Sequence, residues 1–142
     1  MSYDIRLTDP LTGETLELPI KHVMTGGTYV AGYDEETRSF HPKPISKAWL
    51  NITYNYGKFY YEALQKEFNG KDDNLGIRIL YGKSGAESLK WLDQMIDEMK
   101  SSYPRRETDT DYWKATPGNA MKPLFQLRAM AELRPDGIWD GD

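Results

Sequence analysis

The chain has 142 residues, no cysteine, a net charge of −4 and a mean hydropathy of −0.72, which suits one domain that buries its own core. The lack of cysteine excludes disulfides, thiolate metal sites and cysteine nucleophiles. The acidic balance argues against general binding to duplex nucleic acid, which takes clustered Lys and Arg, and the 13% aromatic content argues against disorder.

The N-terminal residues show no basic segment followed by an apolar run, so no secretory signal is expected. No stretch approaches the length of a membrane span. We therefore expect a cytoplasmic protein without a membrane partner, folded as one domain over residues 1–142.

Two short segments near the N-terminus, residues 3–7 and 15–18, alternate between apolar and polar side chains. Turn-forming residues at 9–13 separate them. The pattern predicts a β-hairpin within an N-terminal region of about 1–33.

The spacing of apolar and aromatic residues changes within residues 49–64. Apolar or aromatic residues at 50, 52 and 54 alternate with polar ones, whereas those at 59, 60, 63 and 64 recur at helical spacing. This predicts a strand that runs through a turn at Asn55, Tyr56 and Gly57 into a helix. Junctions of this kind often carry ligand sites.

Residues 76–81 are short and apolar and fit either a strand or a loop. Ser84 and Glu87 then have the spacing of a capping box, and apolar residues at 89, 92, 95, 96 and 99 form the stripe of a buried helix face.

A last helix, extending to about residue 134, is predicted from Thr116 as N-cap and Pro117 as first helical residue. Pro123 would remove an interior hydrogen bond, so either the first turn is irregular or the regular helix begins near Lys122. Trp139 is expected to dock on the core. Because strands precede helices, the predicted fold is α+β: a small, mainly antiparallel sheet with about three helices on one face, the strand–helix unit and two further helices spanning about 48–134.

The string Gly82-Lys83-Ser84 invites comparison with a phosphate-binding loop, but Ile77 stands where that motif needs its first glycine. What remains is a helix start with nearby cations, which can bind an anion and is more simply an ordinary helix start. Thr116 opens a second helix near Lys114.

Each helix start has an adjacent ring, Tyr81 or Trp113, which the simpler interpretation places in the core. If the two starts converge, their amides would take a phosphate and a ring would stack on a base. The candidate ligand-binding set surrounds this expected pocket: Asn55, Tyr56, Arg78, Tyr81, Lys83, Ser84, Trp113, Thr116 and Asn119.

Catalytic patterns are missing. His22 and His41 are the only histidines, neither at metal-ligand spacing from the other. No G-x-S-x-G string is present, and the acidic tail does not match an EF-hand loop. We therefore assign no catalytic residue, no metal site and no cofactor.

Three groups of motifs carry a family resemblance. They are N-I-T-Y-N at 51–55, L-Y-G-K-S-G-A-E-S at 80–88, and Y-W-K-A-T-P-G-N at 112–119 with P-D-G-I-W-D-G-D at 135–142. Together they resemble a family of small, mostly uncharacterised bacteriophage and prophage proteins, over most of residues 49–142. The resemblance implies a phage setting, in which small accessory proteins modulate the host, and it supplies no catalytic residues.

The leading hypothesis is a phage-encoded, non-enzymatic binding protein that sequesters a small anionic nucleotide-type signal of a host defence. The alternative is an inhibitor, or a nucleic-acid mimic, that uses an acidic, aromatic surface against a host protein. A third hypothesis is that the protein is an enzyme that acts on nucleotides through His22 or His41. A homo-oligomer, most simply a dimer, is expected because symmetric assembly is common.

Overall fold

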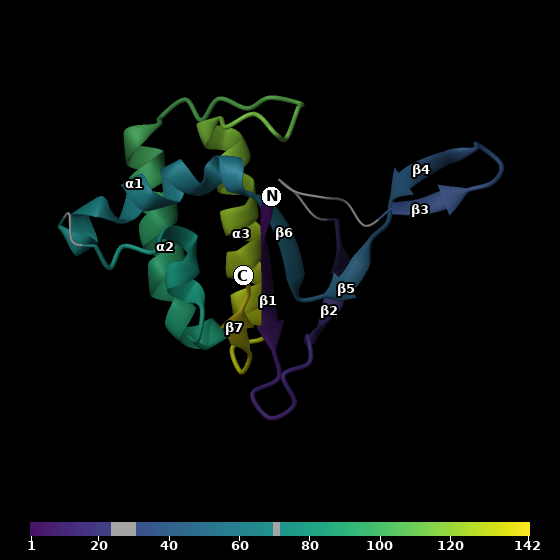
Figure 1. Ribbon diagram of the computed structural model, residues 1–142, viewed down its shortest axis with the longest axis horizontal. Coiled ribbons are helices and arrows are strands. Elements are labelled where there is room, and N and C mark those ends of the chain that lie inside the picture. The colour runs from purple at the N-terminus through teal and green to yellow at the C-terminus, as the bar shows by residue number, and fades with distance from the viewer. Residues whose placement is uncertain (24–30, 70–71) are drawn as a thin grey trace.

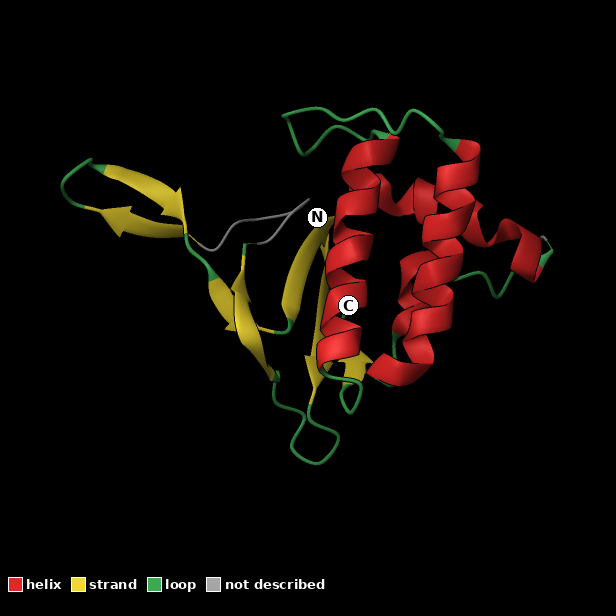
Figure 2. Cartoon of the chain, turned by 180° about the vertical axis from the view of Figure 1, so that it is seen from behind, coloured by secondary structure: helices red, strands yellow, loops and turns green. Residues whose placement is uncertain are grey.

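The computed structural model describes residues 1–23, 31–69 and 72–142, with side-chain surroundings for all of these except 31–33 and 40–42. Within these ranges the fold is α+β, as predicted, with three α-helices gathered on one side of a small sheet (Figures 1 and 2). None of the helices in the described ranges is long and apolar enough to cross a bilayer. The helices are α1 (Gly57–Phe68), α2 (Gly85–Ser102) and α3 (Pro117–Leu133). The strands are β1 (Ser2–Thr8), β2 (Glu17–His22), β3 (Ala31–Asp34), β4 (Ser39–Pro42), β5 (Ile45–Lys47), β6 (Trp49–Thr53) and β7 (Ile138–Asp140).

Strand β1 is the centre of the main sheet. It pairs antiparallel with β6, where Ile5 lies opposite Leu50, and with β7, where Leu7 lies opposite Trp139. The side chains at 3, 5 and 7 are buried in the core, and those at 4 and 6 are exposed. Because successive residues of a strand point to opposite faces, β1 gives the sheet one core face and one open polar face.

The predicted hairpin between residues 3–7 and 15–18 forms only at its closed end. There the Asp9 N–H donates to the Glu14 carbonyl, Thr8 bridges Thr15, and the Leu16 N–H donates to the Leu7 carbonyl. Strand β1 instead pairs along five residues with β6, whose apolar side chains complete the core. Local alternation identifies a strand but does not choose its partner.

The other strands form an arm beside the main sheet. Strand β2 pairs with β5, where Glu17 lies opposite Lys47, and β3 pairs with β4 in a hairpin at the end of this ribbon. The hairpin projects away from the helices (Figure 1).

The strand-to-helix junction predicted at 55–57 is confirmed. A 3-10 turn, Tyr54–Tyr56, joins β6 to α1, and the Thr53 hydroxyl caps it by accepting the Asn55 amide. Residues 76–80, expected to be a strand or a loop, form a 3-10 helix packed against α1. Its first residue, Gly76, has φ +59°, a left-handed conformation that favours glycine.

The capping box at the start of α2 is confirmed, with Ser84 and Glu87 exchanging hydrogen bonds. Helix α3 begins at Pro117 behind the N-cap Thr116 and continues through Pro123. The predicted irregular turn or late start is therefore wrong. A proline removes only the bond to the carbonyl four residues back, and packing against α2 along much of its length holds α3 in place.

The expected docking of Trp139 is confirmed, because its side chain is 1% exposed. Its indole N–H donates to the Ser88 hydroxyl at 2.7 Å, and that hydroxyl donates to the Gly85 carbonyl at 2.7 Å. The backbone of Trp139 also bonds to Gly82 and Lys83. Strand β7 thereby joins the sheet to the start of α2.

We predict that Ser88→Ala lowers the free energy of unfolding by about 1–3 kcal/mol, because it leaves the buried indole N–H of Trp139 without an acceptor. Urea denaturation measures the loss. Ser101→Ala, on the exposed end of the same helix, is the control and should change little. Equal effects of the two variants would contradict the assigned role of the Ser88 hydroxyl.

Candidate functional site

The first-turn amides of α2 are used by the protein itself. Gly85 N–H donates to the Gly137 carbonyl at 2.8 Å, and Ala86 N–H donates to the Pro135 carbonyl at 3.2 Å. The Glu87 amide donates to Ser84, while the Glu87 carboxylate accepts from the Ser84 amide. An anion at this helix start would have to displace those acceptors.

Helix α3 begins in the same way. Pro117 has no N–H, Gly118 N–H donates to the Glu107 carbonyl at 2.7 Å, and Asn119 N–H donates to the Thr116 hydroxyl at 3.3 Å. A Cβ on Gly118 would lie 2.5 Å from the Arg106 carbonyl oxygen, so glycine permits this close approach.

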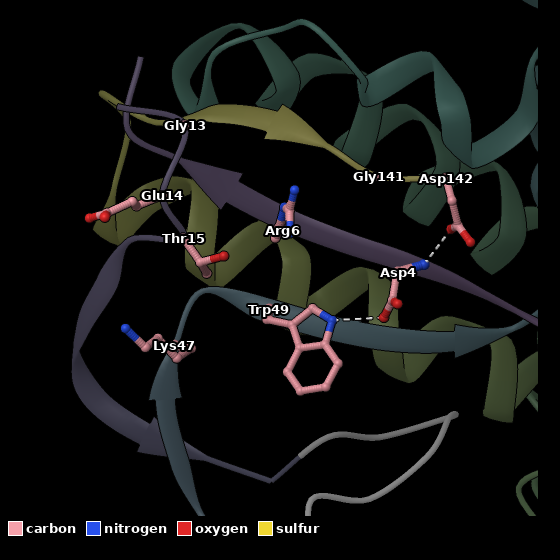
Figure 3. A pocket seen from close by; sticks show the side chains of 9 residues that line it. All are labelled: Asp4, Arg6, Gly13, Glu14, Thr15, Lys47, Trp49, Gly141 and Asp142. Carbon is pink, nitrogen blue, oxygen red and sulfur yellow. Dashed lines mark hydrogen bonds between the residues drawn. The ribbon is translucent and has the colours of Figure 1, made fainter. Parts of the chain in front are cut away.

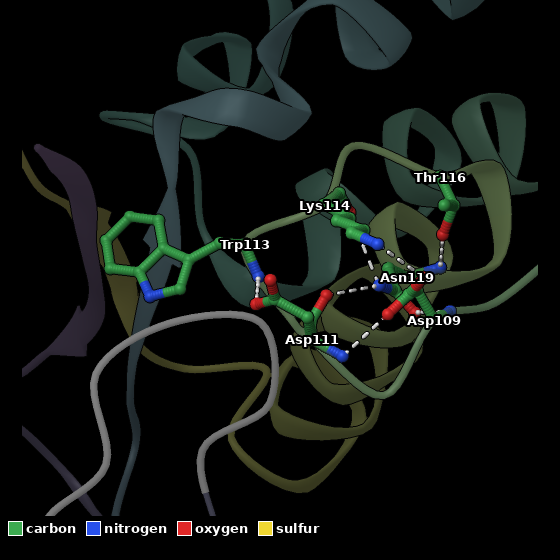
Figure 4. Close-up of polar contacts among 6 residues, drawn as sticks. All are labelled: Asp109, Asp111, Trp113, Lys114, Thr116 and Asn119. Carbon is green, nitrogen blue, oxygen red and sulfur yellow. Dashed lines mark hydrogen bonds and ion pairs between the residues drawn. The ribbon is translucent and has the colours of Figure 1, made fainter.

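Asn119 organises the loop that precedes α3 (Figure 4). Its side chain is 2% exposed, accepts from the Asp109 amide and donates to the carbonyls of Asp111 and Lys114. The indole of Trp113 points away from this cluster. The residues Thr116 to Asn119 therefore hold the preceding loop against the start of α3.

The two helix starts do not converge, so the predicted pocket between them is wrong. Helices α2 and α3 pack antiparallel, so α2 begins beside the end of α3, at residues 135–138, and α3 begins at the far end (Figure 1). An 18-residue helix is roughly 27 Å long, which separates the two starts by about that distance. Lys83 and Ser84 therefore lie far from Thr116 and Asn119.

The remaining predicted residues fall into two small groups. Asn55 donates to the Trp113 carbonyl at 2.7 Å and Tyr56 to the Tyr112 carbonyl, which ties the 55–57 turn to the loop before α3. Tyr56 is fully buried. Ligand binding by Asn55 and by Trp113, whose side chain is exposed, stays a prediction.

Arg78 and Tyr81 lie beside the C-terminal residue Asp142, and Arg78 also lies beside Tyr3 at the start of β1. The Arg78 guanidinium is 4.8 Å from the ring centroid of Tyr3, and its Nε donates to the Asp142 carbonyl at 2.8 Å. The Tyr81 hydroxyl donates to the same carbonyl at 3.1 Å. Burial raises the pKa of Tyr81, which stays a neutral donor. Lys83 Nζ donates to the Ile79 carbonyl. The three side chains are thus engaged within the chain.

A cleft of about 860 Å³ lies elsewhere, on the open face of the main sheet (Figure 3). Strand β1 supplies Asp4 and Arg6, β6 supplies Trp49 and β5 supplies Lys47. The loop between β1 and β2 and the residues after β7 form its rims. The remaining lining residues are Gly13, Glu14, Thr15, Gly141 and Asp142.

Hydrogen bonds fix the ring of Trp49 in this cleft. Its Nε1 donates to Asp4 Oδ1 at 2.8 Å, and the same oxygen accepts from Asn51 Nδ2 at 3.0 Å. The Asp4 amide donates to Asp142 Oδ1 at 2.7 Å. The indole therefore lies over β6 with its N–H directed at Asp4 of β1, and it gives the cleft a fixed aromatic surface (Figure 3).

The cations of the cleft already have partners. Arg6 pairs with Asp140 at 3.3 Å, and Lys47 pairs with Glu17. The Lys47 ammonium, followed by the Ser46 hydroxyl, lowers the pKa of Glu17. Among the described residues, the lining carries three carboxylates and two cations. With Asp140 and Glu17 counted, carboxylates exceed cations by three.

The third hypothesis makes His22 or His41 a catalytic group. His22 Nε2 is 2.8 Å from the Lys47 carbonyl, so that nitrogen carries a proton and joins β2 to β5. His41 falls in β4, and its side chain lies outside what the structure describes. Among the described residues, no group of three His, Asp or Glu side chains is placed to hold a metal ion.

No protein-family model matches the chain, and neither curated proteins nor solved structures give a match.

Sequence reasoning did not find the cleft. The alternation of Asp4 and Arg6 with buried neighbours indicates that they leave the core, which is a usable signal. Their meeting with Trp49, Lys47 and Asp142 depends on pairings between segments up to 138 residues apart. Local patterns do not contain that information.

The occupied start of α2 predicts a pH dependence. Hydrogen bonds from the Ser84 backbone and side chain lower the pKa of Glu87, so the carboxylate stabilises the fold at neutral pH, and this contribution is lost as pH falls through the lowered pKa. The difference in unfolding free energy between the native chain and Glu87→Gln should therefore shrink on acidification. Asp97→Asn, on an exposed site of α2, is the control. A pH-independent difference would contradict the capping role.

Proposed function

We propose that the protein is a non-enzymatic binding protein of phage origin that acts in the host cytoplasm and inhibits a host protein by binding a basic segment of it in the Trp49 cleft. The charge of the cleft carries this proposal. Its carboxylates outnumber its cations, and both cations are already paired within the chain. A Lys- or Arg-bearing segment would find unmatched negative charge there.

The aromatic surface of the cleft favours the same partner. Trp faces attract Lys and Arg side chains, and the indole of Trp49 is held in place before a partner arrives. Preorganisation lowers the entropy lost on binding. Carboxylates presented on a rigid sheet also suit a mimic of nucleic-acid phosphates.

The shape of the cleft favours a macromolecule over a small molecule. Pockets for small ligands enclose most of the ligand and carry few polar groups, whereas this cleft is lined by several charged side chains and spreads over an open sheet face. The first-turn amides of α2 and α3 are occupied by acceptors of the chain, which leaves a free anion without those donors.

A second candidate function is the sequestration of a small anionic nucleotide-type signal. It is favoured by one observation, the presence of Arg6, Lys47 and the Trp49 ring in a cleft of about 860 Å³, a volume within the range of small-molecule sites. In this case a phosphate would replace Asp140 or Glu17 as the partner of a cation.

Titration followed by NMR separates the two functions. A short peptide of alternating Lys and Gly should shift the Trp49 indole N–H and the amides of Asp4 and Glu14 at low salt, and the shifts should fade as salt screens the charges. A matched peptide of Glu and Gly is the negative control. Shifts of the same signals with ATP or cyclic nucleotides, and none with the basic peptide, would favour the second function.

A charge reversal then tests the site. Glu14→Lys should weaken binding of the basic peptide by about threefold to tenfold at low salt, because the reversal removes one exposed charge pair and adds a repulsion of similar size. Asp97→Lys makes the same charge change on α2, away from the cleft, and should have a much smaller effect. Equal losses for both variants would show attraction to overall charge, and the proposed cleft would then be wrong.

A further inference from the structure

Within the described residues, no lysine or arginine lies over the ring of Trp49. Such cations do lie over other rings, at 4.8–5.8 Å from the centroids of Tyr3, Tyr54, Phe59, Trp91 and Phe125. Arg6 lies opposite Trp49 in the β1–β6 pairing, but its guanidinium turns to Asp140 on β7. The face of the indole on the side of the cleft is therefore open to a cation from another molecule.

A carboxylate lies at the edge of this ring. Asp4 Oδ1 accepts from Trp49 Nε1 at 2.8 Å and from Asn51 Nδ2 at 3.0 Å, which places the carboxylate beside the indole nitrogen (Figure 3). A hydrogen bond from the indole N–H to an anion increases the electron density of the ring and strengthens the attraction of its face for a cation. The second oxygen of Asp4, Oδ2, accepts no hydrogen bond from the described residues.

A second carboxylate, that of Asp142, is fixed beside Asp4. Asp142 Oδ1 accepts the Asp4 amide at 2.7 Å, and the Asp142 carbonyl accepts from Arg78 and Tyr81. A Cβ on Gly141 would lie 2.5 Å from the Tyr81 hydroxyl and 2.7 Å from the Asp4 carbonyl oxygen, so glycine allows the residues after β7 to pack this closely. Asp4 and Asp142 thus present two ordered carboxylates at one end of the Trp49 cleft.

Given the function proposed above, on which this inference rests, we propose that the cleft recognises an arginine of the partner's basic segment. Its guanidinium stacks on the Trp49 ring and donates to the carboxylates of Asp4 and Asp142. A guanidinium is planar and weakly hydrated, so it can lie on an indole while the N–H groups at its edge reach two neighbouring carboxylates. A lysine ammonium is a compact, strongly hydrated charge that cannot stack on the ring, so the same site holds it less tightly.

The third carboxylate of the lining, that of Glu14, has a different position. It belongs to the loop between β1 and β2 and lies on the opposite side of the cleft from Asp142 (Figure 3). Glu14 offers a partner negative charge without an adjacent ring. It should therefore attract lysine and arginine alike, which makes it the matched control for Asp142.

Two peptides of equal length and charge, one of alternating Arg and Gly and one of alternating Lys and Gly, test the arginine. We expect the arginine peptide to bind about fivefold more tightly, measured from the NMR shift of the Trp49 indole N–H. Asp142→Asn keeps an oxygen that can accept the Asp4 amide and removes the charge, so it should abolish most of this preference. Glu14→Gln makes the same charge change at the other rim. It should weaken both peptides and leave the preference unchanged.

A second pair of variants tests the ring. Trp49→Leu should abolish the preference for arginine, whereas Trp113→Leu removes another exposed ring, in the loop before α3, and should leave it unchanged. Equal affinity of the native chain for the two peptides, or a preference that survives Asp142→Asn, would overturn the arginine site and leave the proposed function standing. Failure of both peptides to bind would overturn the two together.

Discussion

The burial of Trp139 is the interaction on which the rest of the structure depends. Strand β7 pairs with β1 on one side and with residues 82–84 on the other, and the Trp139 indole is anchored on Ser88. The segment before β7 supplies the carbonyls of Pro135 and Gly137 to the first turn of α2. One short strand therefore closes the sheet, caps α2 and sets the antiparallel packing of α2 and α3.

This closure explains why the most distinctive sequence strings are structural. Ser84 and Glu87 cap α2, Thr116 and Asn119 cap α3 and hold the loop before it, and Gly118 allows that loop to approach. A helix start attracts anions because its amides lack acceptors. In this chain those amides have acceptors from the protein, so the attraction that makes such strings resemble ligand sites is already satisfied.

The sequence predicted the α+β class, the 55–57 junction, the α2 capping box and the burial of Trp139, because each rests on local periodicity or on residues a few positions apart. Prediction from the sequence failed for features that depend on contacts between distant segments of the chain. Strand β1 pairs with β6 and β7 rather than with its neighbour along the chain, and the helix starts lie at opposite ends of an antiparallel pair. The Trp49 cleft is formed by the same long-range pairings, so local sequence patterns could not predict it.

Strand β2 presents an apolar side to α3 and a charged side to the Trp49 cleft. Leu18, Ile20 and His22 face an apolar hollow between β2 and α3, while Glu17 points toward Lys47 at the rim of the Trp49 cleft. Residues two apart on a strand share a face, so one surface can be apolar and the other charged.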